Sequence, residues 1–260
     1  MSNFVVKPKK IMFNFFHKKE KVAAEMPMKT DIHCHIVPGV DDGSPDVETS
    51  VELVERLMGM GIKRIIASPH VTQDTFENTP ETLDPALASL NAALKEKGID
   101  IAVDRSSEYR IDEFFIEQLN AGNIRPYPGG FILVENSFMQ EPWNLEQLLF
   151  DLKVKGFKPI LAHPERYMYY SDKRNRSRYE TLHNQGTFFQ INMLSLADAY
   201  HGPEREVALW LLEKGYVDFI GTDLHNHHHA DCLEAYLSSR HYGKIAAKLR
   251  ETAKNDVWIK

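Results

Sequence analysis

Short apolar runs alternate with longer segments of helical periodicity along most of this chain. From Lys29 onward, the apolar runs predict β-strands at 30–35, 63–68, 100–106, 130–135, 158–162, 187–192 and 217–222. Between them, apolar residues with helical spacing predict helices near 47–60, 80–97, 112–121, 144–155, 174–185 and 203–214, and helical segments at about 232–252 follow the last strand. This alternation is typical of repeated βα units and predicts an α/β fold with a parallel sheet.

Glycines support these boundaries. Each of five glycines falls just after a helical segment and before a strand, where a left-handed residue ends a helix without steric cost: Gly61, Gly98, Gly156, Gly186 and Gly215. Periodicity alone does not separate a closed barrel from an open doubly wound sheet, so that choice has to come from the chemistry of the strand ends.

The length of 260 residues is enough for one α/β barrel domain, although it also permits two smaller domains. We expect one domain over 29–260, preceded by an extension over 1–28. Six lysines between positions 7 and 21 surround an apolar cluster at 11–16 in that extension. The cluster is too short and interrupted for an export signal. A basic aromatic arm can touch an anionic membrane or a partner, but we favour an extension that packs back onto the domain or stays partly mobile.

Charge and cysteine content narrow the class of protein. A net charge of -6 and a pI near 6.1 disfavour nucleic-acid binding through a broad basic surface, although a local basic patch remains open. Only Cys34 and Cys232 are present, which is typical of a reducing cytoplasm without a disulfide framework. No apolar run approaches the roughly 20 residues that span a bilayer, so we expect a cytoplasmic protein with no transmembrane segment.

Histidines and carboxylates recur at the predicted strand ends. In the run from Thr30 to His35, strand alternation would put Asp31, His33 and His35 on one face and Ile32 with Cys34 on the other. Similar side chains follow nearly every later strand, and a closed ring of strands is what brings so many ends to one mouth. The candidate metal ligands are His33, His35, Asp42, His70, Glu108, Glu135, His163, Asp223 and His225.

Five imidazoles and four carboxylates exceed what one or two ions usually take from protein side chains, so we predict up to three divalent ions. Three dications bring about +6 and the carboxylates about -4, which leaves the occupied cluster positive even after one bridging hydroxide is added. A positive cluster favours an anionic substrate, and phosphate esters fit best, with a metal-activated hydroxide as nucleophile.

Each candidate ligand could also have a role unrelated to metal binding. His70 could be a loop histidine, and Glu108 and Glu135 could be surface carboxylates; their joint occurrence at successive strand ends is what favours a site. Arg166, three residues after His163, can bind phosphate with its planar guanidinium, and a surface salt bridge is the alternative.

The cysteines do not support a thiol-based phosphatase. A Cys-x5-Arg loop would need arginine at positions 40 and 238, where Val40 and Ser238 stand instead. The tract His227, His228 and His229 is interpreted as a solvated loop at the mouth that assists phosphate binding or proton transfer, or binds metal adventitiously.

Taken together, the motifs resemble the polymerase and histidinol phosphatase (PHP) superfamily, and within it the capsule-operon tyrosine-protein phosphatases of bacteria. The resemblance runs from about residue 29 to the C-terminus and rests on Asp31–His35, Asp41–Gly43, Ser68–His70, Glu108, Glu135, Ala162–Tyr167 and Gly221–Asn226.

It implies a distorted seven-stranded βα barrel with a trinuclear site for manganese, iron or zinc, of which we expect manganese. The nine candidate ligands and the phosphate-binding Arg166 match the family's positions. A second arginine, expected shortly after the Asp-x-His motif, is replaced here by His227, His228, His229 and Asp231.

The resemblance further implies hydrolysis of phosphotyrosine in the tail of a membrane-bound bacterial tyrosine kinase that controls capsular or exopolysaccharide synthesis, with an oligomer possible. A histidinol-phosphate phosphatase is the nearest alternative. A non-catalytic metal-binding module that docks on a kinase is an alternative of another class, and a nuclease is a weaker one because of the acidic balance.

Overall fold

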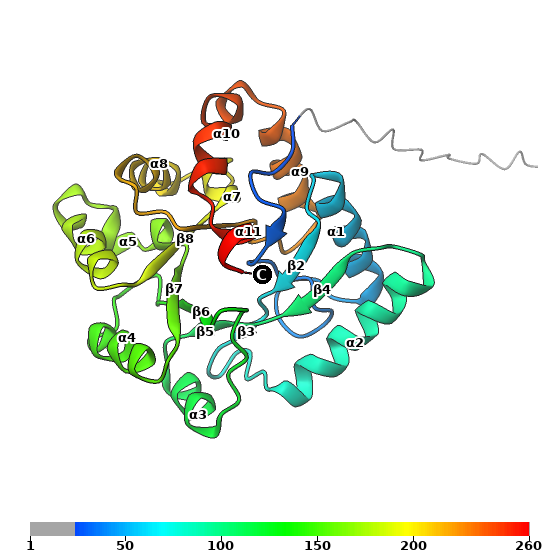
Figure 1. Ribbon diagram of the computed structural model, residues 1–260, viewed down its shortest axis with the longest axis horizontal. Helices are drawn as coiled ribbons and strands as arrows, with labels where there is room; N and C mark the ends of the chain where they lie inside the picture. Colours follow the sequence, from blue (N-terminus) through cyan, green and yellow to red (C-terminus); the bar gives the residue numbers. More distant parts are fainter. Residues whose placement is uncertain (1–23, 260) are drawn as a thin grey trace, which may run out of the picture.

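The computed structural model describes residues 24–259, which form an inner layer of strands surrounded by helices (Figure 1). The strands are β1 (Thr30–Asp31), β2 (Arg64–Ala67), β3 (His70–Val71), β4 (Ala102–Arg105), β5 (Glu108–Arg110), β6 (Phe131–Glu135), β7 (Lys158–Ala162), β8 (Phe188–Asn192) and β9 (Phe219–Gly221). All pairings between these strands are parallel. The α/β fold predicted from the alternating pattern is therefore confirmed.

The strands form two sheets, one in the order β1-β2-β4 and the other in the order β3-β5-β6-β7-β8-β9. Ser68 and Pro69 separate β2 from β3, and Ser106 and Ser107 separate β4 from β5. Pro69 has no N–H for a ladder hydrogen bond, which explains why the predicted strand 63–68 stops and restarts. The curled parallel sheet is confirmed, but the count of seven strands is not, because the residues described form nine.

Backbone hydrogen bonds also join β1 to the far end of the larger sheet. Asp223 N donates to His33 O at 2.7 Å, and His35 N donates to Leu224 O at 2.9 Å. The predicted strand 30–35 ends at Asp31, however, so His33 and His35 lie in the turn that follows it. The first and last strands are thus held together at the ends that carry candidate ligands.

The predicted helices are present with small shifts at their ends. The main helices are α1 (Val47–Gly59), α2 (Pro80–Glu96), α3 (Glu113–Ala121), α4 (Leu145–Val154), α6 (Ser177–Asn184), α8 (Glu204–Lys214), α9 (His227–Leu237) and α10 (Arg240–Thr252). Asp46, Asp112 and Asn226 begin α1, α3 and α9 with side chains that accept a backbone N–H of the first turn. The short elements that sequence patterns missed are α5 (Met168–Ser171), α7 (Met193–Leu196), α11 (Asn255–Trp258) and the 3-10 turns Pro164–Arg166 and Lys173–Asn175. Four-residue helices are too short to produce a periodic signal.

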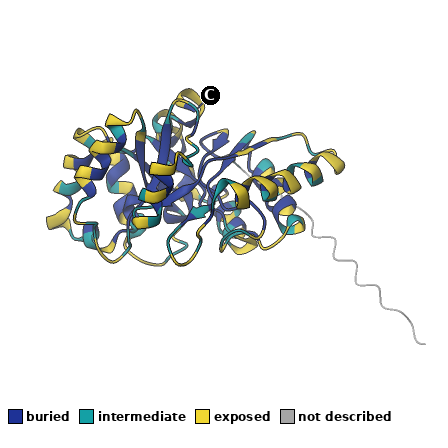
Figure 2. Ribbon diagram, turned by 90° about the horizontal axis from the view of Figure 1, so that it is seen from below, coloured by how far each residue is buried: buried dark blue, intermediate teal, exposed yellow. Residues whose placement is uncertain are grey.

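Burial separates the two faces of each helix. Figure 2 shows dark blue strands in the interior and yellow outward faces on the helices. A smaller apolar cluster lies among the strands and includes Phe131 and Phe219, the first residues of β6 and β9. Trp258 stacks on Phe131 with ring centroids 6.1 Å apart. The amino ends of the strands are therefore filled with aromatic side chains, which leaves the carboxyl ends for polar chemistry.

Helix α11 ties β1 to β9. The Asn255 side chain donates to Thr30 O at 3.0 Å and to Ile220 O at 2.7 Å, and accepts from Ile220 N at 3.1 Å. Asp256 accepts hydrogen bonds from the backbone N–H groups of Lys29 and Thr30. Asn255 is fully buried, so these bonds replace water at the edges of both strands.

The residues just before β1 belong to the packed body. Met26 and Met28 are buried, and Met26 N donates to Met60 O at 2.8 Å. The remainder of the predicted basic extension, 1–23, lies outside the described residues. No helix within 24–259 is both long enough and apolar enough to cross a membrane.

Gly221 lets the first and last strands approach each other. A Cβ at this position would lie 2.5 Å from His33 Cβ and 2.8 Å from Gln190 Nε2. We therefore expect Gly221→Ala to lower the free energy of unfolding by about 1–3 kcal/mol, as overpacking does in other cores. Urea denaturation measures the change.

Gly59→Ala is the matched control, because a Cβ there has no atom within 4 Å and alanine favours the helix. Equal midpoints for Gly221→Ala and the unchanged protein would contradict the close-approach argument.

Candidate metal centre

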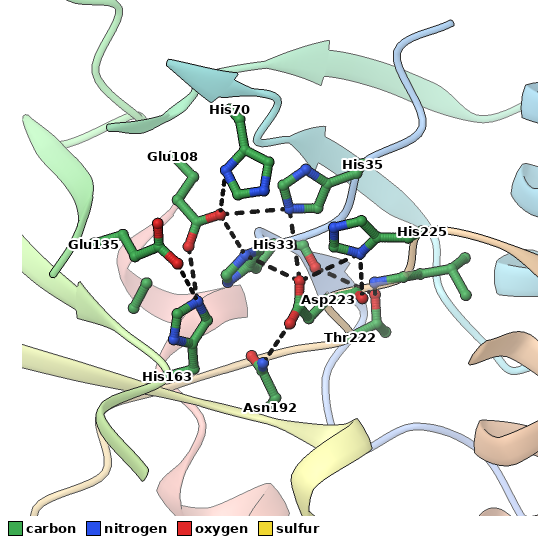
Figure 3. A network of polar contacts seen from close by, with 12 residues as sticks. His33, His35, His70, Glu108, Glu135, His163, Asn192, Thr222, Asp223 and His225 are labelled. Carbon is green, nitrogen blue, oxygen red and sulfur yellow. Dashed lines mark hydrogen bonds and ion pairs between the residues drawn. The ribbon is translucent and has the colours of Figure 1, made fainter. Parts of the chain in front are cut away.

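The nine residues predicted as ligands all gather in one cluster, and all of them except Asp42 are labelled in Figure 3. His70 and Glu108 are the first residues of β3 and β5, and Glu135 is the last residue of β6. Pairing places some of them side by side, since His70 of β3 is the parallel partner of Glu108 of β5. Seven of the nine line a cavity of about 350 Å³, namely Asp42, His70, Glu108, Glu135, His163, Asp223 and His225. His33 and His35 are fully buried beside Glu108 and Asp223. The fold therefore brings together candidate residues that begin, end or follow six different strands, namely β1, β3, β5, β6, β7 and β9.

The ligand atoms of these residues form four overlapping groups, each within 4.8 Å of one another. The groups are His35/Asp42/His70/His225, His33/His163/Asp223, His33/His35/Glu108 and His70/Glu108/Glu135. Within 24–259 these four groups contain all nine candidates and no other residue. Because His33, His35, His70 and Glu108 each belong to two groups, the arrangement suits several ions that share ligands rather than separate sites.

Unpartnered buried atoms test whether the residues fit metal ions. His33 Nε2, His35 Nε2, His70 Nδ1 and Glu108 Oε2 are buried without a hydrogen-bond partner among the described residues. His33 Nε2 lies 3.3 Å from Glu108 Oε2 and 3.4 Å from Asp223 Oδ1. Buried polar atoms are normally hydrogen-bonded. A cluster of unsatisfied nitrogens and carboxylate oxygens facing one another is what divalent ions would satisfy.

Neighbouring side chains fix which imidazole nitrogen faces the cluster. His33 Nδ1 lies 2.7 Å from Gln190 Oε1, and His35 Nδ1 lies 2.9 Å from Asp41 Oδ2. With the Nδ1 proton held by an oxygen acceptor, Nε2 remains free for a metal. Gln190 was not predicted as a site residue, and Asp41 was noted only as the neighbour of Asp42.

Asp223 divides its two oxygens between different partners. Oδ2 accepts hydrogen bonds from Asn192 Nδ2 at 2.6 Å, Arg166 Nη1 at 2.9 Å and Tyr200 OH at 3.1 Å. Oδ1 faces the imidazoles, at 3.4 Å from His33 Nε2. The protein donors therefore hold one oxygen and leave the other for the cluster.

Asp31 does not join the cluster, which corrects the expectation from strand alternation. Its carboxylate accepts hydrogen bonds from the hydroxyl and backbone N–H of Thr222 and from His33 N. The chain turns after Asp31, so the period of two no longer relates this residue to His33 and His35. Asp31 instead fixes the segment that carries Asp223, and burial raises its pKa to about 6.

Two of the candidate ligands have left-handed backbone. The φ angles are 29° at His163 and 56° at Asp223, a region that residues with a Cβ rarely adopt. Such strain concentrates at functional sites, where the surrounding contacts impose it.

Burial and charge together set the ionisation of the metal-free cluster. Burial opposes the charged form of His33, but attraction to Glu108 and Asp223 outweighs it and raises the pKa of His33 to about 10. Burial likewise opposes charge on His163, and hydrogen bonds to Glu108 and Glu135 raise its pKa to about 9. Burial and the nearby imidazoles of His225 and His70 lower the pKa of His35 to about 4. These shifts favour the charged forms of His33 and His163 and the neutral form of His35 at neutral pH.

Arg166 lies at the cavity rather than in a surface salt bridge. It lines the cavity, its side chain is 25% exposed, and its partner is the buried Asp223. Burial works against its charge, yet Asp223 holds the pKa of Arg166 above its usual value. A permanent cation therefore lies next to the candidate metal ligands.

The histidine tract is helical, not a loop. His227, His228 and His229 form the first turn of α9, because Asn226 caps the helix. His229 lines the cavity, whereas His227 pairs with Glu52 at 3.1 Å and His228 contacts Cys232 at 3.8 Å. Cys34 is buried in the apolar core, where burial raises the pKa of its thiol well above the usual value.

Comparisons with known proteins agree with this architecture. The family model for capsular polysaccharide synthesis, CpsB/CapC, matches residues 29–248. Tyrosine-protein phosphatase YwqE of Bacillus subtilis (strain 168) is 34% identical over 201 residues, covering 75% of this chain and 77% of that protein. The putative tyrosine-protein phosphatase CapC of Staphylococcus aureus is 29% identical over 199 residues, covering 75% of this chain and 76% of its own length.

A comparison with solved structures also finds a tyrosine phosphatase of this kind. A chain from the crystal structures of YwqE from Bacillus subtilis and CpsB from Streptococcus pneumoniae, described as metal-dependent tyrosine phosphatases, superimposes with a TM-score of 0.72 and 30% identity. The match covers 86% of this chain and 95% of that one.

The curled parallel sheet with its cluster of histidines and carboxylates places the protein in the PHP class. Within that class, the chain belongs to the CpsB/CapC family of capsular polysaccharide synthesis.

The raised pKa values of His33 and His163 predict a measurable linkage. Both imidazoles are protonated at pH 7 in the metal-free protein, so a metal ion that takes their nitrogens has to displace protons. We expect loading at pH 7 to release roughly one to two protons per chain and the affinity for metal to fall as the pH is lowered.

Titration calorimetry in two buffers with different ionisation enthalpies measures this release. An observed enthalpy that is the same in both buffers would show that these nitrogens do not exchange protons for metal.

Proposed function

We propose that this chain is a metal-dependent phosphatase that hydrolyses phosphotyrosine in proteins. The observation that carries the proposal is the set of nine ligand-type side chains in four overlapping groups around one cavity that also holds Arg166. The named relatives, which are tyrosine-protein phosphatases, support the choice of substrate.

We further propose that the nine residues hold up to three divalent ions, with manganese first and iron or zinc as alternatives. When bound, such ions supply Lewis acidity that polarises phosphoryl oxygens and makes a hydroxide nucleophile available from water at neutral pH. The buried, protonated thiol of Cys34 lies in the apolar core and offers no competing nucleophile.

Residues of the cavity wall can bind the substrate phosphate. Arg166 has Nη1 committed to Asp223, so its other guanidinium N–H groups are the ones that can bind phosphate oxygens. His229 Nδ1 accepts a hydrogen bond from His225 N at 3.3 Å, which assigns the proton of the neutral ring to Nε2. His229 also lines the cavity, so its Nε2–H can donate a hydrogen bond to a substrate oxygen.

The proposed partner is the phosphotyrosine-bearing tail of a membrane-bound bacterial tyrosine kinase that controls capsule or exopolysaccharide synthesis, with the phosphatase acting in the cytoplasm. Family membership in capsular polysaccharide synthesis supports this setting.

The decisive assay compares a tyrosine phosphopeptide with histidinol phosphate on manganese-, iron- or zinc-loaded protein, with a chelated control. Chelator-sensitive preference for the peptide supports the proposal. Preference for histidinol phosphate would replace it with the biosynthetic alternative, and full metal occupancy without turnover would favour the docking module.

Removal of one central ligand should abolish metal binding and activity together. We expect His33→Ala to lower activity by more than about a hundredfold and to reduce the metal content, because His33 belongs to two of the ligand groups. Metal analysis and initial rates on the phosphopeptide measure both effects.

Cys34→Ser is the control, since it changes the adjacent buried residue outside the ligand groups and should leave turnover intact. Full activity of His33→Ala, or inactivity of a folded, metal-loaded Cys34→Ser, would contradict the ligand assignment.

Arg166 should act on substrate binding rather than on metal binding. We expect Arg166→Ala to raise KM about tenfold to a hundredfold, the range for loss of charged hydrogen bonds to phosphate, while the metal content stays unchanged. Steady-state kinetics with parallel metal analysis separates the two. An unchanged KM would assign Arg166 only to orienting Asp223.

A further inference from the structure

Two aromatic side chains flank Arg166 at the cavity. The guanidinium carbon lies 4.8 Å from the ring centroid of Phe138 and 4.4 Å from that of Tyr200. Both rings line the same cavity as the candidate metal ligands. Neither residue carries a charge or a ligand atom that would mark it in the sequence.

The sheet explains why these three side chains meet. Phe138 follows β6, Arg166 follows β7 and Tyr200 follows β8, and these strands are neighbours in the order β6-β7-β8. Loops from three successive strands therefore place the arginine between two aromatic residues. The nearness of the three residues therefore follows from the order of the strands.

Tyr200 is also fixed at its hydroxyl. Tyr200 OH donates to Asp223 Oδ2 at 3.1 Å, the same oxygen that accepts from Arg166 Nη1 at 2.9 Å. On the other side, Phe138 stacks on His163 with centroids 5.5 Å apart and an interplanar angle of 19°. Both rings are thus anchored to candidate ligands.

We infer that Phe138 and Tyr200 form an aromatic collar around Arg166 that selects phosphate esters of aromatic alcohols. The guanidinium between the rings binds the phosphoryl group. The rings contact the aryl part of the bound ester where it extends out of the cavity. An alkyl ester such as phosphoserine offers no ring to stack and gains nothing from the collar. This inference rests on the proposed phosphatase function and names the residues that set its substrate class.

The test uses binding without turnover. Phenylphosphonate and methylphosphonate are non-hydrolysable probes that differ in the aryl group, and titration calorimetry on manganese-loaded protein gives the affinity of each. We expect Tyr200→Leu and Phe138→Leu each to weaken phenylphosphonate by about tenfold and methylphosphonate by less than about threefold, with unchanged metal content.

Two variants serve as controls. Tyr200→Phe keeps the ring and should retain the preference for the aryl probe. Tyr236→Leu removes another buried tyrosine ring, on α9 and outside this cavity, and should leave both affinities unchanged.

Equal weakening of both phosphonates in Tyr200→Leu and Phe138→Leu, or no weakening in either, overturns the inference. If the unchanged protein prefers phenylphosphonate through these residues but hydrolyses no tyrosine phosphopeptide, the collar stands and the proposed function fails.

Discussion

Charge compensation inside one buried cluster is the constraint on which the rest of this structure depends. Glu108, Glu135 and Asp223 are almost completely removed from water, and ionised carboxylates in such surroundings require opposite charge. In the metal-free chain that charge comes from the imidazoliums of His33 and His163. Dications can take over the same task, and they would leave the cluster with a net positive charge.

The scaffold around the cluster is built to hold this arrangement. Gln190 orients His33, Asp41 orients His35, and Asn192 holds one oxygen of Asp223. These partners contact the candidate ligands and leave their metal-facing atoms free. Aromatic packing at the opposite ends of the strands, around Phe131, closes the interior there.

Sequence patterns predicted nine candidate ligands that the fold brings close together, because charged groups after apolar strands are rare and recur here in a fixed order. They failed where the backbone departs from ideal geometry. Asp31 was placed with the ligands because a period of two was extended past the end of β1, and the strand counts failed where Pro69 interrupts a ladder. The charge on Arg166 marked it, but the contacts that decide its role are tertiary.

Residues that carry no distinctive chemistry were the ones missed. Gln190 and Asn192 alternate along β8, and two inward amides in an otherwise apolar strand were an available signal. Phe138 and Tyr200 had none, because an aromatic residue in a loop has the same appearance whether it faces solvent or a cavity. These two residues lie close to Arg166 because β6, β7 and β8 are neighbouring strands, and a single sequence does not reveal this strand order.

The bridge that Asn255 makes between Thr30 and Ile220 has a consequence for biosynthesis. During translation, the segment carrying His33 and His35 is synthesised more than two hundred residues before Asn255. The last candidate ligands, Asp223 and His225, also follow His33 and His35 by nearly two hundred residues. A nascent chain of this protein therefore cannot complete the ligand set before synthesis has passed β9, and the Asn255 bridge forms later still.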